Sequence, residues 1–99
     1  YAILKYFMEQ DTFVAWAESM DKPGFSVTKP CDGNTATVGN GVMIALQAKD
    51  KEMVNAVYAK AIELGGTDEG EPGPRGDEGF YAGYSRDLDG NKLNIFCMG

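Results

Sequence analysis

Short runs of apolar and aromatic residues predict β-strands in the first third of the chain. These runs cover residues 1–8, 12–19 and 25–29, with polar turn residues between them. Each run is too short for a typical helix and is rich in the residue types that strands favour. Pro30 ends the third run, because proline cannot donate a hydrogen bond to a β-ladder. The pattern predicts a three-stranded antiparallel meander.

The period of the pattern changes in the middle of the chain. Residues 41–48 alternate between two faces and predict a further strand. From Asp50, a suitable N-cap, the apolar residues recur at helical spacing until Gly65 and Gly66 end the helix. Residues 67–77 contain three Gly and two Pro. They predict a surface loop with room for a short edge strand at its start.

The last 20 residues predict a β-hairpin. Residues 80–86 and 93–98 form its two arms, and residues 87–91 carry the Asp, Gly and Asn side chains that favour a tight turn. The whole second half therefore has the order strand, helix, edge segment, strand, strand.

The two halves of the chain resemble each other in layout. Placing Phe13 on Phe80 aligns two strands, and a turn and an alternating strand follow each. This similarity suggests two copies of one βαβββ unit, the first without its opening strand and helix, a segment of about 25–35 residues. The alternative is that the sequence is whole and the similarity is chance.

Composition and charge narrow the classes of function. The chain has 99 residues, 43% of them hydrophobic, which is enough for one globular domain. Its net charge is −6 and no basic cluster is present, so a nucleic-acid partner is not expected. No apolar run is long enough to span a membrane, so no membrane partner is expected either. Two widely separated cysteines predict reduced thiols and a cytoplasmic location.

The sequence contains no histidine. This absence excludes Ser-His-Asp and Cys-His catalysis within the chain. It also removes the usual nitrogen ligand of zinc, nickel, copper and iron. A metal would need carboxylates alone, or ligands from outside this sequence.

Several motifs of the second half together resemble the vicinal oxygen chelate superfamily of glyoxalase I, extradiol dioxygenases and bleomycin-resistance proteins. They are G-V-M-I-A-L-Q-A, a helix ending in E-L-G-G, the segment E-G-E-P-G-P-R and, most specifically, R-D-L-D-G-N-K-L-N. The resemblance implies an α+β fold in which βαβββ modules form a U-shaped, partly open mixed β-barrel around a cavity. Residues 1–99 would form a single glyoxalase-like domain. Residues 1–30 would be the remainder of the first module, and residues 41–98 would be the second. A homodimer is expected.

The resemblance also implies where a catalytic metal would bind. Family enzymes hold a divalent ion with four side chains, of which three positions can be identified here. Those positions carry Ser26, Met43 and Asn94, and a hydroxyl, a thioether and an amide bind Zn²⁺ or Ni²⁺ poorly. No metal cofactor is therefore expected. Zn²⁺ or Ni²⁺ would require ligands that this sequence does not contain.

Three functions remain open at this point. The first is binding of a small organic molecule in the sheet cavity, lined by Trp16, Ser26, Met43, Tyr84, Asn94 and Phe96. The second is an enzyme, a lyase or isomerase of the glyoxalase type. Its catalytic residues are unknown, because nothing distinguishes the nearby acids Glu18, Asp77 and Glu78. The third is an assembly module completed by a partner subunit.

Two arginines are candidates for contact with an anionic ligand. Arg75 and Arg86 could each offer paired N–H groups. The simpler alternatives are solvent exposure for Arg75 and pairing with Asp87 or Asp89 for Arg86.

Overall fold

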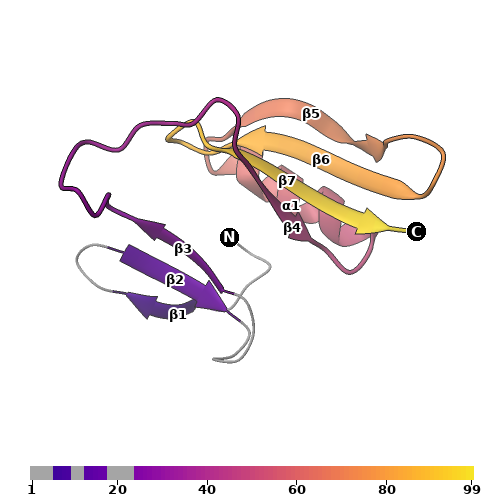
Figure 1. Ribbon diagram of the computed structural model, residues 1–99. Helices are drawn as coiled ribbons and strands as arrows, with labels where there is room; N and C mark the ends of the chain where they lie inside the picture. The colour runs from indigo at the N-terminus through magenta and orange to yellow at the C-terminus, as the bar shows by residue number, and fades with distance from the viewer. Residues whose placement is uncertain (1–5, 10–12, 18–23) are drawn as a thin grey trace. The chain divides into compact units, whose positions relative to one another are not determined.

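The computed structural model describes residues 6–9, 13–17 and 24–99, the first two ranges by their backbone alone (Figure 1). The chain divides into two compact units, Tyr1–Thr37 and Val38–Gly99. Each unit has a sheet of its own.

The first unit contains the predicted meander. It consists of β1 (Tyr6–Glu9), β2 (Phe13–Ala17) and β3 (Gly24–Thr28), paired antiparallel in that order. In the pairing of β2 with β3, Trp16 is opposite Phe25 and Ala15 is opposite Ser26.

The second unit is a complete βαβββ module. Its elements are β4 (Met43–Gln47), α1 (Lys51–Glu63), β5 (Thr67–Pro74), β6 (Phe80–Arg86) and β7 (Lys92–Met98). The sheet order is β4-β7-β6-β5. β4 pairs parallel with β7, whereas β6 pairs antiparallel with both β7 and β5. The fold is therefore α+β with a mixed, unclosed sheet, as predicted.

The core of this unit lies between α1 and one face of the sheet (Figure 1). The Asp50 carboxylate caps the helix by accepting a 2.8 Å hydrogen bond from the Met53 N–H, as the sequence predicts. Val54 on the helix is fully buried and packs with Ile95 and Cys97 of β7. Since β7 lies between β4 and β6, its apolar residues are at the centre of the packed layer.

The prediction of a loop over residues 67–77 is wrong for most of its length. β5 continues as a strand to Pro74 along the outer edge of the sheet. Its register with β6 shifts between Asp68 and Gly70 and again between Gly70 and Gly73. An edge strand tolerates Pro and Gly because one side of its backbone needs no ladder partner. Bulges absorb the extra residues.

The turn between β6 and β7 forms as predicted. One Asp87 carboxylate oxygen accepts hydrogen bonds from the backbone N–H groups of Asp89 at 3.0 Å and Asn91 at 2.9 Å. Gly90 has a φ of 90°, which glycine adopts without strain.

In the part of the chain that the structure describes, no helix has the length and apolar character needed to cross a bilayer.

Candidate functional site

Strand alternation divides the side chains of the second sheet between two faces. Leu93, Ile95 and Cys97 of β7 face α1. The intervening residues of β7 and their partners on β4 and β6 face away from the helix, on a surface that we name the distal face. It carries Met43, Ala45, Gln47, Phe80, Ala82, Tyr84, Arg86, Lys92, Asn94, Phe96 and Met98.

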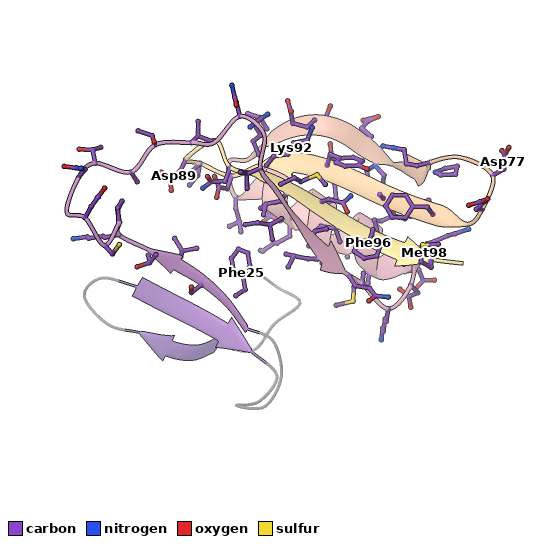
Figure 2. All side chains as sticks on the ribbon, in the orientation of Figure 1. Phe25, Asp77, Asp89, Lys92, Phe96 and Met98 are labelled. Carbon is purple, nitrogen blue, oxygen red and sulfur yellow. The ribbon has the colours of Figure 1, made fainter. Side chains whose placement is uncertain are left out.

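One end of the distal face is apolar. The rings of Phe80 and Phe96 stack with their centroids 5.5 Å apart. Ala82 is directly opposite Phe96 on the neighbouring strand and is fully buried. Met98, opposite Phe80, extends the apolar surface to the end of β7 (Figure 2).

Asn94 occupies the centre of the distal face. Its residue is only 1% exposed, and its side-chain N–H donates a long 3.5 Å hydrogen bond to the Gly83 carbonyl oxygen. Tyr84 is directly opposite it on β6, and Ala45 is its partner on β4. A buried amide with one weak bond to the protein can also bond to a ligand.

The other end of the distal face is charged and surrounds Tyr84. The Arg75 guanidinium carbon lies 5.5 Å from the centre of the Tyr84 ring, and Lys92 Nζ lies 5.6 Å from it. Glu69 Oε1 lies 3.2 Å from Arg86 Nε and 3.8 Å from Lys92 Nζ. Figure 2 shows Lys92 at the end of β7 away from Met98. The face therefore changes from apolar to cationic along the strands.

Two glycines leave room for Arg75 beside β5. A Cβ at Gly70 would lie 3.3 Å from Arg75 Nη2, and one at Gly73 would lie 3.2 Å from Arg75 Nη1. The guanidinium donates to the carbonyl oxygens of Glu71 at 2.8 Å and Pro74 at 3.3 Å. The absence of side chains at both glycines thus allows the cation to lie along the edge strand and reach Tyr84.

Asp68, another acidic residue of β5, forms a hydrogen bond with the helix on the opposite face of the sheet. The Tyr58 hydroxyl on α1 donates a 2.6 Å hydrogen bond to Asp68 Oδ1, which also accepts from the Gly70 N–H. The bond to the carboxylate, with smaller effects of burial and of the Asp68 and Glu71 charges, raises the pKa of Tyr58 to about 12. The same hydrogen bonds lower the pKa of Asp68.

The structure brings four of the six predicted site residues onto one face. Tyr84, Asn94 and Phe96 lie on adjacent positions of β6 and β7, and Met43 lies on β4 opposite Lys92. Ser26 is exposed on β3, and Trp16 belongs to β2, so both are in the first unit. The side chain of Trp16 lies outside the described residues.

The residues at the predicted metal positions do not fit a divalent ion. Met43 offers a thioether, Ser26 a hydroxyl and Asn94 a neutral amide. Over the described residues, no group of three or more His, Cys, Asp or Glu side chains comes together as a metal site would require. The chemistry of the distal face is that of aromatic rings, one buried amide and several cations.

Glu69 and Lys92 lie in the site, but no pattern in the sequence predicted them there. For Arg75 the sequence left two possibilities, contact with an anionic ligand and simple exposure to solvent. Arg75 is half-buried against Tyr84, and Arg86 contacts Glu69 and the Gly90 carbonyl oxygen, the latter at 2.8 Å. The spacing of Gly70, Gly73 and Arg75 is the signal that could have found the site. Two glycines precede an arginine within a few residues, so the long arginine side chain has space to lie along the chain.

Comparison with protein-family models and with curated proteins finds no match. Among solved structures, the chain is similar to a glyoxalase/bleomycin resistance protein from Albidiferax ferrireducens T118. The identity is 31% and the TM-score is 0.82, over 93% of this chain and 74% of the other.

Two further structures share the fold at lower identity. A glyoxalase-related enzyme from Fulvimarina pelagi has 14% identity and a TM-score of 0.72, over 95% of this chain and 70% of the other. A hypothetical protein from S. aureus has 24% identity and a TM-score of 0.69, over 95% of this chain and 75% of the other. These two structures show the fold alone. The Albidiferax structure, at 31% identity over 93% of this chain and 74% of its own, shows that the chain belongs to the glyoxalase/bleomycin resistance protein family.

Proposed function

We propose that this protein binds a small organic molecule on the distal face, without a catalytic metal. The observation that carries the proposal is the composition of that face. An aromatic pair, Phe80 and Phe96, adjoins a buried amide, Asn94, and a polar aromatic, Tyr84. Sites for small molecules are typically apolar surfaces with a few fixed polar groups.

The metal-free part of the proposal is tested by calorimetric titration. The protein is stripped with a chelator and titrated with Ni²⁺ and then Zn²⁺. We expect no tight stoichiometric binding, because the three predicted positions carry Ser26, Met43 and Asn94. Binding of either ion at one site per chain with a submicromolar Kd would contradict the proposal. It would favour the alternative of a metal-dependent lyase or isomerase.

The binding part is tested by NMR with a library of small aromatic compounds. We expect shifts confined to the amides of β6 and β7, and their loss in Phe96→Ala, which removes half of the stacked pair. Leu64→Ala is the matched control, because Leu64 is exposed at the end of α1 and not on the distal face. Chemical-shift changes that persist in Phe96→Ala, or that occur at the amides of α1, would place the ligand elsewhere.

A second proposal concerns assembly, and it is carried by β4. This strand is last in its sheet among the described residues, and Val42, Met43 and Ile44 around its start are 67%, 45% and 36% exposed. An apolar edge with unpaired backbone groups recruits another strand. We propose that β4 pairs with a second copy of this chain as a homodimer.

Sedimentation analysis tests the dimer. We expect a dimer for the wild type and a monomer for Ile44→Lys, which places a charge on the edge strand. Val38→Lys is the control, because Val38 is a similarly exposed apolar residue outside β4. A wild-type monomer at micromolar concentration would overturn this proposal and leave ligand binding unaffected.

A further inference from the structure

We infer that the ligand of the distal face is an organic anion, whose carboxylate or phosphate is bound beside Tyr84 by Arg75 and Lys92. This inference rests on the proposed function, since it names the ligand class of the same site. It is carried by the charges and contacts around Tyr84, which the aromatic pair does not explain.

The positive charge around Tyr84 is only partly neutralised within the protein. Arg75 and Lys92 lie near the Tyr84 ring, and Arg86 lies two residues after Tyr84 on β6. Among the described residues, Glu69 is the carboxylate that pairs with two of these cations, Arg86 and Lys92. Two of the three cations thus share one carboxylate, in a chain whose net charge is −6. A local excess of positive charge in an acidic protein favours an anionic ligand.

Arg75 is the cation best placed to bind that anion. Among the described residues its guanidinium donates to two neutral carbonyl oxygens, those of Glu71 and Pro74. A guanidinium has five N–H donors, so two such bonds leave donors for a further acceptor. Neither carbonyl neutralises the charge, which makes an oxyanion the preferred acceptor.

Three acidic residues of β5 and of the turn after β6 have partners other than Arg75. Asp68 accepts the Tyr58 hydroxyl on the helix side of the sheet. Asp87 accepts two backbone N–H groups and the Asn91 side-chain amide within the turn. Glu69 lies between Arg86 and Lys92. None of these contacts neutralises Arg75 in the part of the chain that is described.

The site is organised before a ligand arrives. Gly70 and Gly73 provide the space in which the Arg75 guanidinium lies, and the Tyr84 ring supports it from the sheet. A cation held in position loses less side-chain freedom on binding than a free surface arginine does. The glycine pair is therefore part of the binding site, although neither residue offers a functional group.

The distal face also limits the shape of the ligand. Phe96 is two residues from Asn94, which is opposite Tyr84, so the aromatic pair begins about 7 Å from the charged end. A molecule that reaches both ends has an apolar or aromatic body and an anionic group a few bonds away. Short arylalkyl acids and arylalkyl phosphates have this form.

The test compares anionic probes with a neutral one. The full chain is titrated with 4-phenylbutyrate, 3-phenylpropyl phosphate and the neutral 4-phenylbutanol, which have linkers of similar length, and binding is followed by changes in the amide chemical shifts of β6 and β7. We expect both the carboxylate and the alcohol to change the amide chemical shifts of residues near Phe96. We expect the Kd of the carboxylate to be lower than that of the alcohol by a factor of about ten or more. The tighter of the two anions identifies a carboxylate or a phosphate as the natural group.

Variants then assign the anion site. Arg75→Gln should weaken the binding of 4-phenylbutyrate about tenfold and leave the binding of the alcohol unchanged. Gly73→Ala keeps the charge but displaces the guanidinium, so it should weaken the same ligand by a smaller factor. Lys60→Gln is the control, because it removes a charge from the exposed face of α1. Thermal unfolding of each variant confirms that it is folded.

The outcomes separate the two proposals. If the alcohol binds as tightly as both anions, or if Arg75→Gln and Gly73→Ala leave 4-phenylbutyrate binding unchanged, the anion inference is overturned while ligand binding on the distal face stands. If no probe changes the amide chemical shifts of β6 or β7, both the anion inference and the proposal of ligand binding on the distal face fail.

Discussion

The Tyr58 hydroxyl on α1 donates a 2.6 Å hydrogen bond to Asp68 on β5 and thereby joins the helix to the edge strand of the sheet. Besides this link, Tyr58 of the helix and Pro72 of the edge strand both lie over Gly83, where a Cβ would be 3.2 Å from Tyr58 Cδ1 and 3.1 Å from Pro72 Cγ. The edge strand, rich in Gly and Pro, is thus held by the helix as well as by its ladder with β6.

Replacing Tyr58 with Phe should change how stability depends on pH. The pKa of Asp68 is lowered in the folded state, so its contribution is present above its unfolded pKa of about 4 and is lost as pH falls through the folded value. The pKa of Tyr58 is raised to about 12, so its contribution is complete below about pH 10 and is lost as pH rises through 12.

We therefore expect Tyr58→Phe to be less stable than the wild type between these limits and to converge with it at both extremes. Urea denaturation over a pH series measures the difference. Tyr81→Phe is the control, because Tyr81 donates to the neutral Asn55 side chain at 2.7 Å instead of a carboxylate. A constant difference across all pH values would contradict this explanation.

Gly66→Ala should destabilise the second unit by about 2 kcal/mol or more. A Cβ at this position would lie 2.8 Å from the backbone oxygens of both Ala61 and Arg86, and neither backbone moves easily. Gly41→Ala is the matched control, since a Cβ there meets nothing within 4 Å. We expect it to change stability by less than about 0.5 kcal/mol. Equal midpoints of urea denaturation for the two variants would refute the prediction.

Asn94→Asp should lower the free energy of unfolding by about 1–3 kcal/mol near neutral pH. The amide is buried and its N–H donates to the Gly83 carbonyl oxygen, so a carboxylate there would face an acceptor without a proton to share. Burial raises the pKa of the introduced carboxyl, so the loss is smallest below about pH 4 and grows as pH rises. The same change at the exposed Asn40 should have little effect at any pH.

The two thiols should differ in reactivity. Cys31 is exposed, whereas Cys97 is buried beside Val54 in the core, and both are free. A thiol reagent should modify one cysteine rapidly in the native protein and the second only with denaturant. Cys97→Ser should retain the rapid phase and Cys31→Ser should lose it. Rapid reaction of both thiols would contradict the packing of β7.

Local signals in the sequence predicted most of the fold. The cap at Asp50, the glycines after the helix and the turn from Asp87 to Asn91 each act within a few residues, so a single sequence reveals them. β5 was missed because its Pro and Gly residues have the composition of a loop. Only its position at the edge of the sheet permits them there.

The candidate site was predictable to a smaller extent. Alternation along the last strand is enough to predict that Asn94 and Phe96 share a face, and the register of β6 with β7 adds Tyr84 to it. The contact of Arg75 with Tyr84 depends on the bulged register of β5, which no local pattern specifies. Glu69 was missed for the same reason.

The position of β7 in its sheet has a consequence for synthesis of the protein on the ribosome. β7 is the last strand of the module, yet it pairs with β4, the first, and Met43 is the partner of Lys92. Until β7 has left the exit tunnel, β4 lacks this parallel partner, and Val54 of α1 lacks Ile95 and Cys97, with which it packs in the core. The core of the module is therefore completed only after its final strand has emerged, and the long-range parallel pairing makes that step slow. A nascent chain stalled before Lys92 would expose the helix to chaperones and proteases.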